Sequence, residues 1–254
     1  MSLFALALLA PAGPAGGVIP SAQRVLAAVA EGNQAAGRTG VLRLDLELVG
    51  REGTVVGTGE ILADPSGQAR LELRAPSGLV ERHLKRGGSY RASRNGTPLA
   101  DPKPLLPPLA LLQLAAALDL ETALRRAGVA TGELVLGRAG DLDCFVIGGR
   151  LPGVDRGDPP LRAAFWVDVE SLQPVRIDRP DGIRYALGSG SKFGSLELPA
   201  WIQVEVAGRA DLRMVIRSAE VVRPAPGSFD SGWLAAPRPA APSPPPPAAE
   251  VRSE

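Results

Sequence analysis

The chain has 254 residues, of which 45% are hydrophobic and only 4% aromatic, and it carries 28 Lys and Arg against 27 Asp and Glu. This length and composition suffice for a domain with a substantial core, built mainly from aliphatic side chains. The two signs of charge are interspersed, so the basic field that a nucleic-acid binder needs is missing. A single Cys and a single His leave neither an internal disulfide nor a Cys/His zinc site.

Residues 1–17 have a short apolar run followed by small residues and prolines, as in the apolar region and cleavage zone of a signal peptide. The positively charged region that normally precedes such a run is missing. The run is also far shorter than the roughly 20 apolar residues that a membrane-spanning helix needs. We therefore expect a signal peptide or a flexible N-terminus.

An amphipathic helix is predicted over residues 21–31, capped by Ser21 and ended by Gly32-Asn33. After it the hydrophobic period changes to two, because leucines at positions 42, 44, 46 and 48 alternate with charged residues. Short alternating segments joined by Gly- and Pro-containing turns then follow, which predicts an antiparallel meander. Its strands are expected at 42–48, 54–62, 69–75, 79–85 and 89–93.

A Pro-rich linker, residues 102–108, leads into the segment LALLQLAAAL at 109–118, which is apolar almost all round. Such a helix is buried, and a second short helix is expected over 121–127, capped by Asp119 and ended by Gly128. Helices inserted between two runs of strands favour an α+β architecture.

Residues 161–177 predict a hairpin with one apolar and one charged face. In its first strand Phe165 and Val167 share a face with Ala163, whereas Trp166 and Asp168 lie on the other. Pro174 is expected to begin the second strand or to occupy an edge, because proline cannot donate to a sheet ladder. Further strands are expected at 133–136, 144–147, 183–187, 202–206 and 212–216, and glycine- or proline-rich loops at 151–160 and 188–194.

The composition changes after residue 234 to Ala, Pro and Ser. A segment of this kind buries too little apolar surface to offset its ordering entropy, so residues 235–254 are expected to be a disordered tail. Residues 18–234 are then a single domain.

The sequence contains no set of residues whose spacing is typical of a catalytic site. Ser189 and Lys192 have the Ser-x-x-Lys spacing, but they fall in a glycine-rich stretch between strands rather than at a helix start. Alternate carboxylates, Asp141 with Asp143 and Asp168 with Glu170, are common on solvated strands and turns. His83 is expected on a basic strand face without a carboxylate partner, and Cys144 as a buried, inert strand residue. We therefore expect no enzyme, no metal and no cofactor.

The apolar strand faces have two interpretations. Amphipathic strands mostly fold around a filled core, here one lying under two helices. Alternatively, a curved sheet whose apolar face is incompletely filled leaves a cavity for an acyl chain, with which the abundant Ala and sparse aromatics are compatible.

The order of elements resembles the LolA-like outer-membrane lipoprotein carrier superfamily. The resembling features are the helix at 21–31, Gly59-Glu60-Ile61-Leu62 followed by Ala69-Arg70-Leu71-Glu72-Leu73, the turn Gly87-Gly88-Ser89-Tyr90, the helical insert, Phe165-Trp166-Val167-Asp168 with Leu172-Gln173-Pro174-Val175-Arg176, Leu198-Pro199, and Phe229.

This resemblance implies a curved antiparallel half-barrel with helices covering a concave apolar face. It further implies a periplasmic, monomeric carrier that shelters lipid or lipoprotein acyl chains in transit to the outer membrane, with membrane-bound donor or acceptor proteins as partners. Residues 109–127 are then the lid. The expected cavity residues are Leu44, Leu46, Leu71, Leu73, Leu111, Leu112, Phe165, Val167, Ile177, Ile202 and Val204.

The chain departs from that family in three respects. An arginine in the turn after the second strand helps to hold the lid shut in the family, but Ala63-Asp64-Pro65 here contains none. Aromatic residues are fewer than in the family, and the proline-rich tail is additional. The alternative function is therefore an envelope regulatory or scaffolding module of the same fold, which binds a protein partner.

Overall fold

The computed structural model describes residues 19–50, 52–148, 162–206 and 209–236. The expected signal segment at 1–17, the loop at 151–160, Leu161 and the tail beyond Ala236 lie outside these ranges. None of the helices that the structure describes is long and apolar enough to cross a bilayer.

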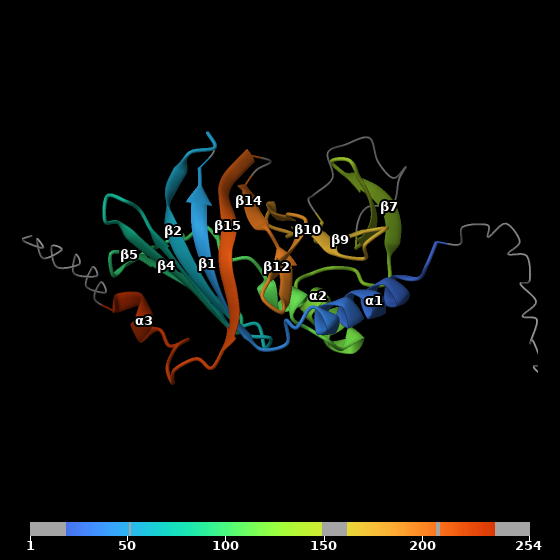
Figure 1. Ribbon diagram of the computed structural model, residues 1–254, viewed down its shortest axis with the longest axis horizontal. Coiled ribbons are helices and arrows are strands. Elements are labelled where there is room, and N and C mark those ends of the chain that lie inside the picture. The colour runs from blue at the N-terminus through green and yellow to red at the C-terminus, as the bar shows by residue number, and fades with distance from the viewer. Residues whose placement is uncertain (1–18, 51, 149–161, 207–208, 237–254) are drawn as a thin grey trace, which may run out of the picture.

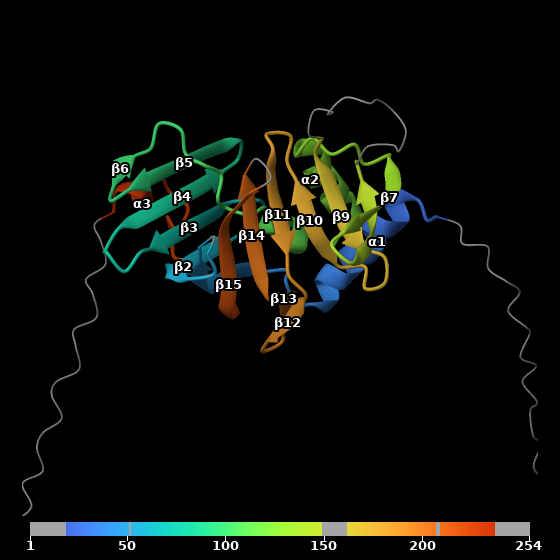
Figure 2. The ribbon, with the colours of Figure 1, turned by 90° about the horizontal axis from the view of Figure 1, so that it is seen from above.

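Within the described ranges, thirteen strands form one antiparallel sheet that does not close on itself (Figure 2). Their order is β6-β5-β4-β3-β2-β1-β15-β14-β11-β10-β9-β8-β7. The first wing, which we define as β2–β6, comprises β2 (Val55–Ala63), β3 (Ala69–Arg74), β4 (Val80–Arg86), β5 (Ser89–Arg94) and β6 (Thr97–Pro98). The long strand β15 (Arg209–Val222) pairs with β1 (Val41–Val49) and so joins the two ends of the chain at the middle of the sheet.

The second wing is β14 (Trp201–Val206), β11 (Ile183–Leu187), β10 (Pro174–Asp178), β9 (Ala164–Asp168), β8 (Leu142–Ile147) and β7 (Leu134–Ala139). A separate two-stranded hairpin, β12 (Gly190–Phe193) with β13 (Leu196–Pro199), projects between β11 and β14 (Figure 2).

The alternation of apolar and charged residues in the sequence explains which side chains of the sheet are buried. Leu42, Leu44, Leu46 and Leu48 of β1 are all buried on one face, which we call the concave face. Because successive side chains of a strand point to opposite faces, the charged residues between them lie on the convex face. The same pattern continues into both wings, so that the concave side chains merge into one large core.

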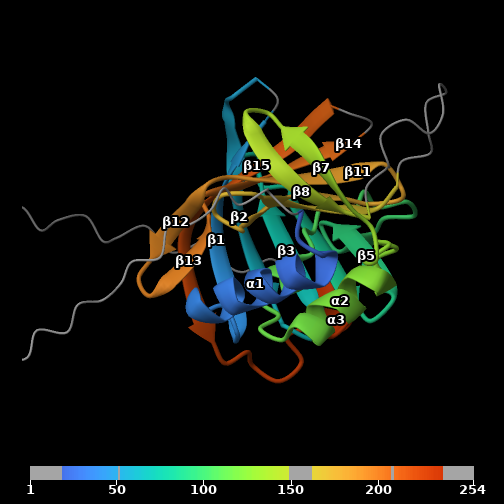
Figure 3. The ribbon, with the colours of Figure 1, turned by 90° about the vertical axis from the view of Figure 1, so that its right-hand side faces the viewer.

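The helices lie on both sides of the sheet. α1 (Ala22–Ala35) and α2 (Ala117–Arg126) lie side by side at the open side of the curled sheet (Figures 1 and 3). The single 3-10 turn η1 (Leu109–Leu112) precedes α2. The short helix α3 (Gly232–Ala235) instead contacts β4, β5 and β6 on the far side of the first wing (Figure 1). The predicted class, a curved antiparallel half-barrel with helices over its concave face, is confirmed.

Several local predictions were wrong. α1 continues past Gly32-Asn33 to Ala35, and the left-handed residue that follows it is Gly37, with φ 71°. Residues 109–118 are not one helix but η1 followed by a break, and α2 begins at Ala117, so that Asp119 lies in its first turn and is not its cap. The stretch 188–194, predicted to be a loop, contains β12.

The hairpin at 161–177 is present over its described part, with Pro174 as the first residue of β10. Phe165 and Val167 are inaccessible to water in the core. On the convex face Arg176 stacks over the Trp166 ring at 4.2 Å, and the Trp166 indole donates to Asp178 at 2.9 Å. The predicted apolar and charged faces of this hairpin are therefore both present in the structure.

Candidate functional site: a lidded apolar interior

The eleven side chains predicted to line a cavity lie in one continuous core under α1 and α2. Ten of them are buried, and Leu73 is half-buried at the margin. They come from both wings, from β1 and from η1, so the structure does bring them together: Leu44, Leu46, Leu71, Leu73, Leu111, Leu112, Phe165, Val167, Ile177, Ile202 and Val204. They pack on one another and on the helices, which makes this interior well filled in the present conformation.

The lid expected at 109–127 is continuous with the linker that precedes it, so from here on we define the lid as residues 102–127, which comprise the linker 102–108, η1 and α2. Its apolar side chains are part of the core that the lid shares with α1 and the sheet, because Leu109, Leu111 and Leu112 of η1 and Leu120 and Leu124 of α2 all belong to it. Leu120 and Leu124 are four residues apart and therefore lie on one helix face. The lid is therefore held in place mainly by apolar contacts, and an acyl chain would make contacts of the same kind.

Gln113 ties the lid to the first wing, a role that the sequence analysis missed. Its amide nitrogen donates to the carbonyls of Gly40 (2.7 Å) and Ala63 (3.2 Å), while its carbonyl oxygen is buried without a hydrogen-bond partner. Ala63 is the last residue of β2. A lone polar residue within an apolar run was the signal that could have identified this contact, because buried amides need partners.

Asn33 ties the lid to α1. Its side-chain nitrogen donates to the carbonyls of Leu111 (3.1 Å) and Leu114 (2.9 Å). Its oxygen accepts from the buried Arg38, which also donates to the carbonyl of Glu197 and to Gln173 (3.2 Å). Burial lowers the pKa of the Arg38 guanidinium, and the neighbouring Glu197 opposes this effect. These contacts join α1, the lid and the second wing.

Two tyrosines, one from each wing, hold the linker. The Tyr185 hydroxyl of β11 donates to the Pro104 carbonyl at 2.6 Å. The Tyr90 hydroxyl of β5 lies 3.2 Å from the Lys103 carbonyl and accepts from the Leu106 amide at 3.3 Å. Burial raises the pKa of both hydroxyls, so they remain protonated and able to donate. The linker is thus fixed at the point where the wings approach each other.

The expectation for His83 was wrong. The side chain is fully buried on the concave face, with Nε2 2.9 Å from Glu81 Oε1 and Nδ1 2.9 Å from the Tyr90 hydroxyl. The segment Arg82-His83-Leu84-Lys85 suggested a basic surface because the sequence did not show that β4 is covered on both faces. The linker approaches one face, and α3 packs on the other.

The end of the chain covers part of the convex face, which the sequence did not predict. The ring of Trp233 is contacted by the guanidinium groups of Arg70 at 5.0 Å and Arg82 at 5.3 Å. Arg82 is buried, pairs with Glu72 at 2.7 Å and donates to the carbonyl of Trp233 at 3.1 Å. We call this group, Arg70, Glu72, Arg82 and Trp233, the convex clamp. Ala235 and Ala236, assigned to the tail from sequence, belong to the structured domain.

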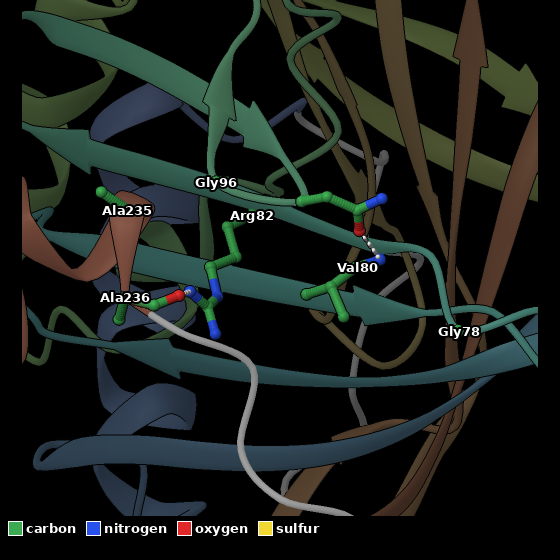
Figure 4. A pocket seen from close by; sticks show the side chains of 7 residues that line it. Gly78, Val80, Arg82, Gly96, Ala235 and Ala236 are labelled. Atoms are coloured by element: carbon green, nitrogen blue, oxygen red, sulfur yellow. Dashed lines mark hydrogen bonds between the residues drawn. The ribbon is translucent and has the colours of Figure 1, made fainter.

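A cavity of about 320 Å³ lies beside the convex clamp, between α3 and the loops flanking β4 and β5 (Figure 4). Its lining includes Arg82, Val80, Ala235 and Ala236, with glycines 78 and 96. This cavity lies on the face opposite the predicted acyl site.

The residues that the sequence offered as catalytic candidates lie in strands and turns, where they have structural roles. Lys192 lies within β12 and Ser189 immediately before it, which is extended chain rather than the helix start that a Ser-Lys pair requires. Asp168 accepts hydrogen bonds from Ser171 in the turn; burial alone would raise its pKa, but these bonds lower it. Cys144 is buried, as predicted. Within the described ranges, no group of three or more His, Cys, Asp or Glu is placed to hold a metal.

No protein-family model matches the chain, and neither does any curated protein. Solved structures that match include a LolA superfamily protein from Nitrosomonas europaea, at 12% identity and TM-score 0.46 over 85% of this chain and 100% of that one. A DUF1329 family protein from Desulfovibrio piger matches at 11% identity and TM-score 0.46, again over 85% and 100%. A chain of the MucA/MucB complex of Pseudomonas aeruginosa matches at 15% identity and TM-score 0.30, over 84% and 62%.

These are likenesses of fold, and the first of them is to the superfamily that the sequence motifs resemble. With TM-scores below 0.5, they say nothing about the ligand or partner of this chain. The class that the fold and site define is a non-closed antiparallel half-barrel whose apolar concave face lies under a helical lid.

Proposed function

We propose that this chain is a non-enzymatic, exported carrier-like protein that binds acyl chains of lipids or lipoproteins between its sheet and its lid. The observation that carries the proposal is the way in which the lid is attached. It covers a continuous apolar surface drawn from both wings, but a handful of hydrogen bonds, centred on Gln113, Asn33, Tyr90 and Tyr185, hold it in place.

The balance of free energies favours replacement of the lid's contacts by those of an acyl chain. When the lid moves outward and packs on the acyl chain instead of on the sheet, its own apolar side chains stay out of water, so the broken polar contacts are the main cost. Each of them is worth about 0.5–1.5 kcal/mol. Each buried methylene contributes about 0.8 kcal/mol, so a chain of about twelve contributes roughly 10 kcal/mol. A long acyl chain can therefore compete with the lid, whereas a short one cannot.

The test is titration with a fluorescent long-chain fatty acid, in wild-type protein and in Gln113→Ala. The proposal predicts saturable uptake by the wild type and faster uptake by the variant. Glu220→Gln is a suitable control because Glu220 is exposed on the convex face, and it should behave as the wild type does. Absence of saturable uptake in wild type and variant alike would refute the acyl-binding proposal.

A second candidate function is a regulatory or scaffolding module that binds a protein through the tail. The convex clamp favours it, because Arg82 of the clamp binds the carbonyl of Ala236, the last described residue before the tail, on the face opposite the lid. Capture of a partner that is lost on truncation after Ala236 would support this function. The truncation leaves the clamp intact, so unchanged capture would argue directly against a role for the tail.

A further inference from the structure

Two positively charged side chains from opposite wings lie close together at the rim of the apolar interior. Lys85 is the last residue but one of β4 in the first wing, and Arg179 begins the turn between β10 and β11 in the second. Burial lowers the pKa of the Lys85 ammonium, and the nearby charge of Arg179 lowers it further. The two like charges therefore repel each other in the protein without a ligand.

Lys85 projects from the concave face of the sheet. Its direct neighbours across the sheet are Ala69 on β3 and Tyr90 on β5, and both pack in the concave core. Directly opposite residues of antiparallel strands share a face, so the half-buried Lys85 lies on this face too. Its ammonium has no hydrogen-bond or ion-pair partner among the residues that the structure describes. A half-buried cation without a partner is costly, and a bound anion would remove this cost.

Arg179 is oriented by a carboxylate of its own turn. Asp181 accepts hydrogen bonds from its Nε at 3.1 Å and from its Nη2 at 2.7 Å, while the Arg179 side chain is 36% exposed and can be reached by a ligand. The charge of Arg179 also acts on the hydroxyls of Tyr90 and Tyr185, where it opposes the rise in pKa that burial causes. Arg179 therefore lies beside the two tyrosines that hold the linker.

The local charge is positive. Asp181 balances one of the two cations, which leaves one positive charge in excess. The other carboxylate on this face of β4, Glu81, is already bound by His83 and Arg94. An ammonium and a guanidinium are the side-chain groups that bind carboxylates and phosphates with charge-assisted hydrogen bonds.

We propose that Lys85 and Arg179 form a headgroup site, which binds the carboxylate or phosphate oxygens of an anionic lipid whose acyl chain lies under the lid. This inference rests on the proposed function and narrows its cargo to lipids with a negatively charged head. The site adjoins the interior directly, because Ala69, Tyr90 and Tyr185 belong to the same apolar core. A chain inserted between sheet and linker leaves its head beside both cations.

The experiment compares ligands that differ mainly in head charge, using full-length protein at about pH 8, where a carboxylate is ionised and lysine is protonated. One pair is a fluorescent long-chain fatty acid and its methyl ester. The other is lysophosphatidic acid and the corresponding monoacylglycerol, measured by displacement of the fluorescent ester. Wild type should bind the charged member of at least one pair about tenfold more tightly, as for a hydrogen bond between charged groups. The pair that shows the preference identifies the headgroup as carboxylate or phosphate.

Lys85→Met should remove most of this preference and leave binding of the neutral ligands unchanged, whereas Lys85→Arg should retain it. Lys192→Met is the matched control, because Lys192 is exposed on β12, beyond the end of β11 that is farther from Arg179. Arg179→Gln keeps Lys85 and should weaken the preference, so it decides the matter if Lys85→Met does not fold.

Equal binding of charged and neutral ligands by the wild type would overturn the headgroup site and leave acyl binding intact. A preference that persists in both Lys85→Met and Arg179→Gln would also overturn it. Failure of all four ligands to bind would refute the proposed function, and the headgroup site with it.

Discussion

The side chain of Gln113 in the lid donates a hydrogen bond to the main-chain carbonyl of Ala63 at the end of β2, at 3.2 Å. The same side-chain nitrogen donates to the carbonyl of Gly40, immediately before β1, at 2.7 Å. A neutral amide of the lid therefore bridges the start of β1 and the end of β2.

Replacing Gln113 with Ala should lower the free energy of unfolding by about 1–3 kcal/mol, because two carbonyls in a buried interface lose their donor. Urea unfolding measures the change. Gln203→Ala is the matched control: this glutamine lies half-buried on the convex face and donates to Glu205 at 3.0 Å. Its loss should stay within about 0.5 kcal/mol. Equal effects of the two substitutions would show that Gln113 has no special role.

Arg38→Ala should be more damaging, by about 3 kcal/mol or more, because bonds from a charged donor are worth about 1.5–3 kcal/mol each and three acceptors lose theirs. These acceptors belong to Asn33, Gln173 and Glu197. For comparison, Arg217 is exposed and pairs with Glu47 across β1 and β15. Arg217→Ala should cost at most about 1 kcal/mol. Thermal unfolding of the two variants would contradict the account if their order were reversed.

Trp233→Ala should release residues 223–236 from the convex face, because the ring contacts both Arg70 and Arg82. Limited proteolysis should then cut within this segment faster than in the wild type. Each cation–π contact is worth about 0.5–1 kcal/mol at a partly exposed site, so global stability should fall only modestly. Uptake of the acyl probe should not change, since the lid lies on the other face. Impaired uptake would show that the two faces are coupled.

Acid should destabilise the protein through Glu81. Its folded-state pKa is about 2, against an ordinary value of 4.5. A lowered pKa contributes stability that is fully present above the ordinary value and is lost as the pH falls towards the folded value. The midpoint of urea unfolding should therefore decrease between about pH 4.5 and 2, and this decrease should be smaller in Glu81→Gln. An identical decrease in the variant would assign the effect to other carboxylates.

The strands were predictable because alternation is a local signal. Leu42 to Leu48 and Phe165 with Val167 fall on the buried face that their period of two indicates. β12 was missed because it is only four residues long and begins at a glycine, and its partner β13 follows after two residues, so little alternation develops.

The polar contacts of the site were not predictable, because they join residues far apart in sequence. Asn33 was read as a helix stop, yet it lies inside α1 and binds carbonyls 78 and 81 residues away. The carbonyls of Leu111 and Leu114, which lie at the break after η1, therefore accept from the side chain of a residue that is distant in sequence. His83 was misjudged for the same reason: its burial depends on the linker and on Tyr90, which its neighbours in sequence do not reveal.

The central claim, that the interior under the lid holds acyl chains, is tested most directly by native mass spectrometry of the full-length protein purified from the cells that produce it. We expect a population heavier by the mass of a lipid or an acylated peptide, which long-chain fatty acids displace. We also expect Gln113→Ala to lose this species more readily on gentle activation. Protein that is uniformly free of acyl species, and that takes up none when they are added, would contradict the claim.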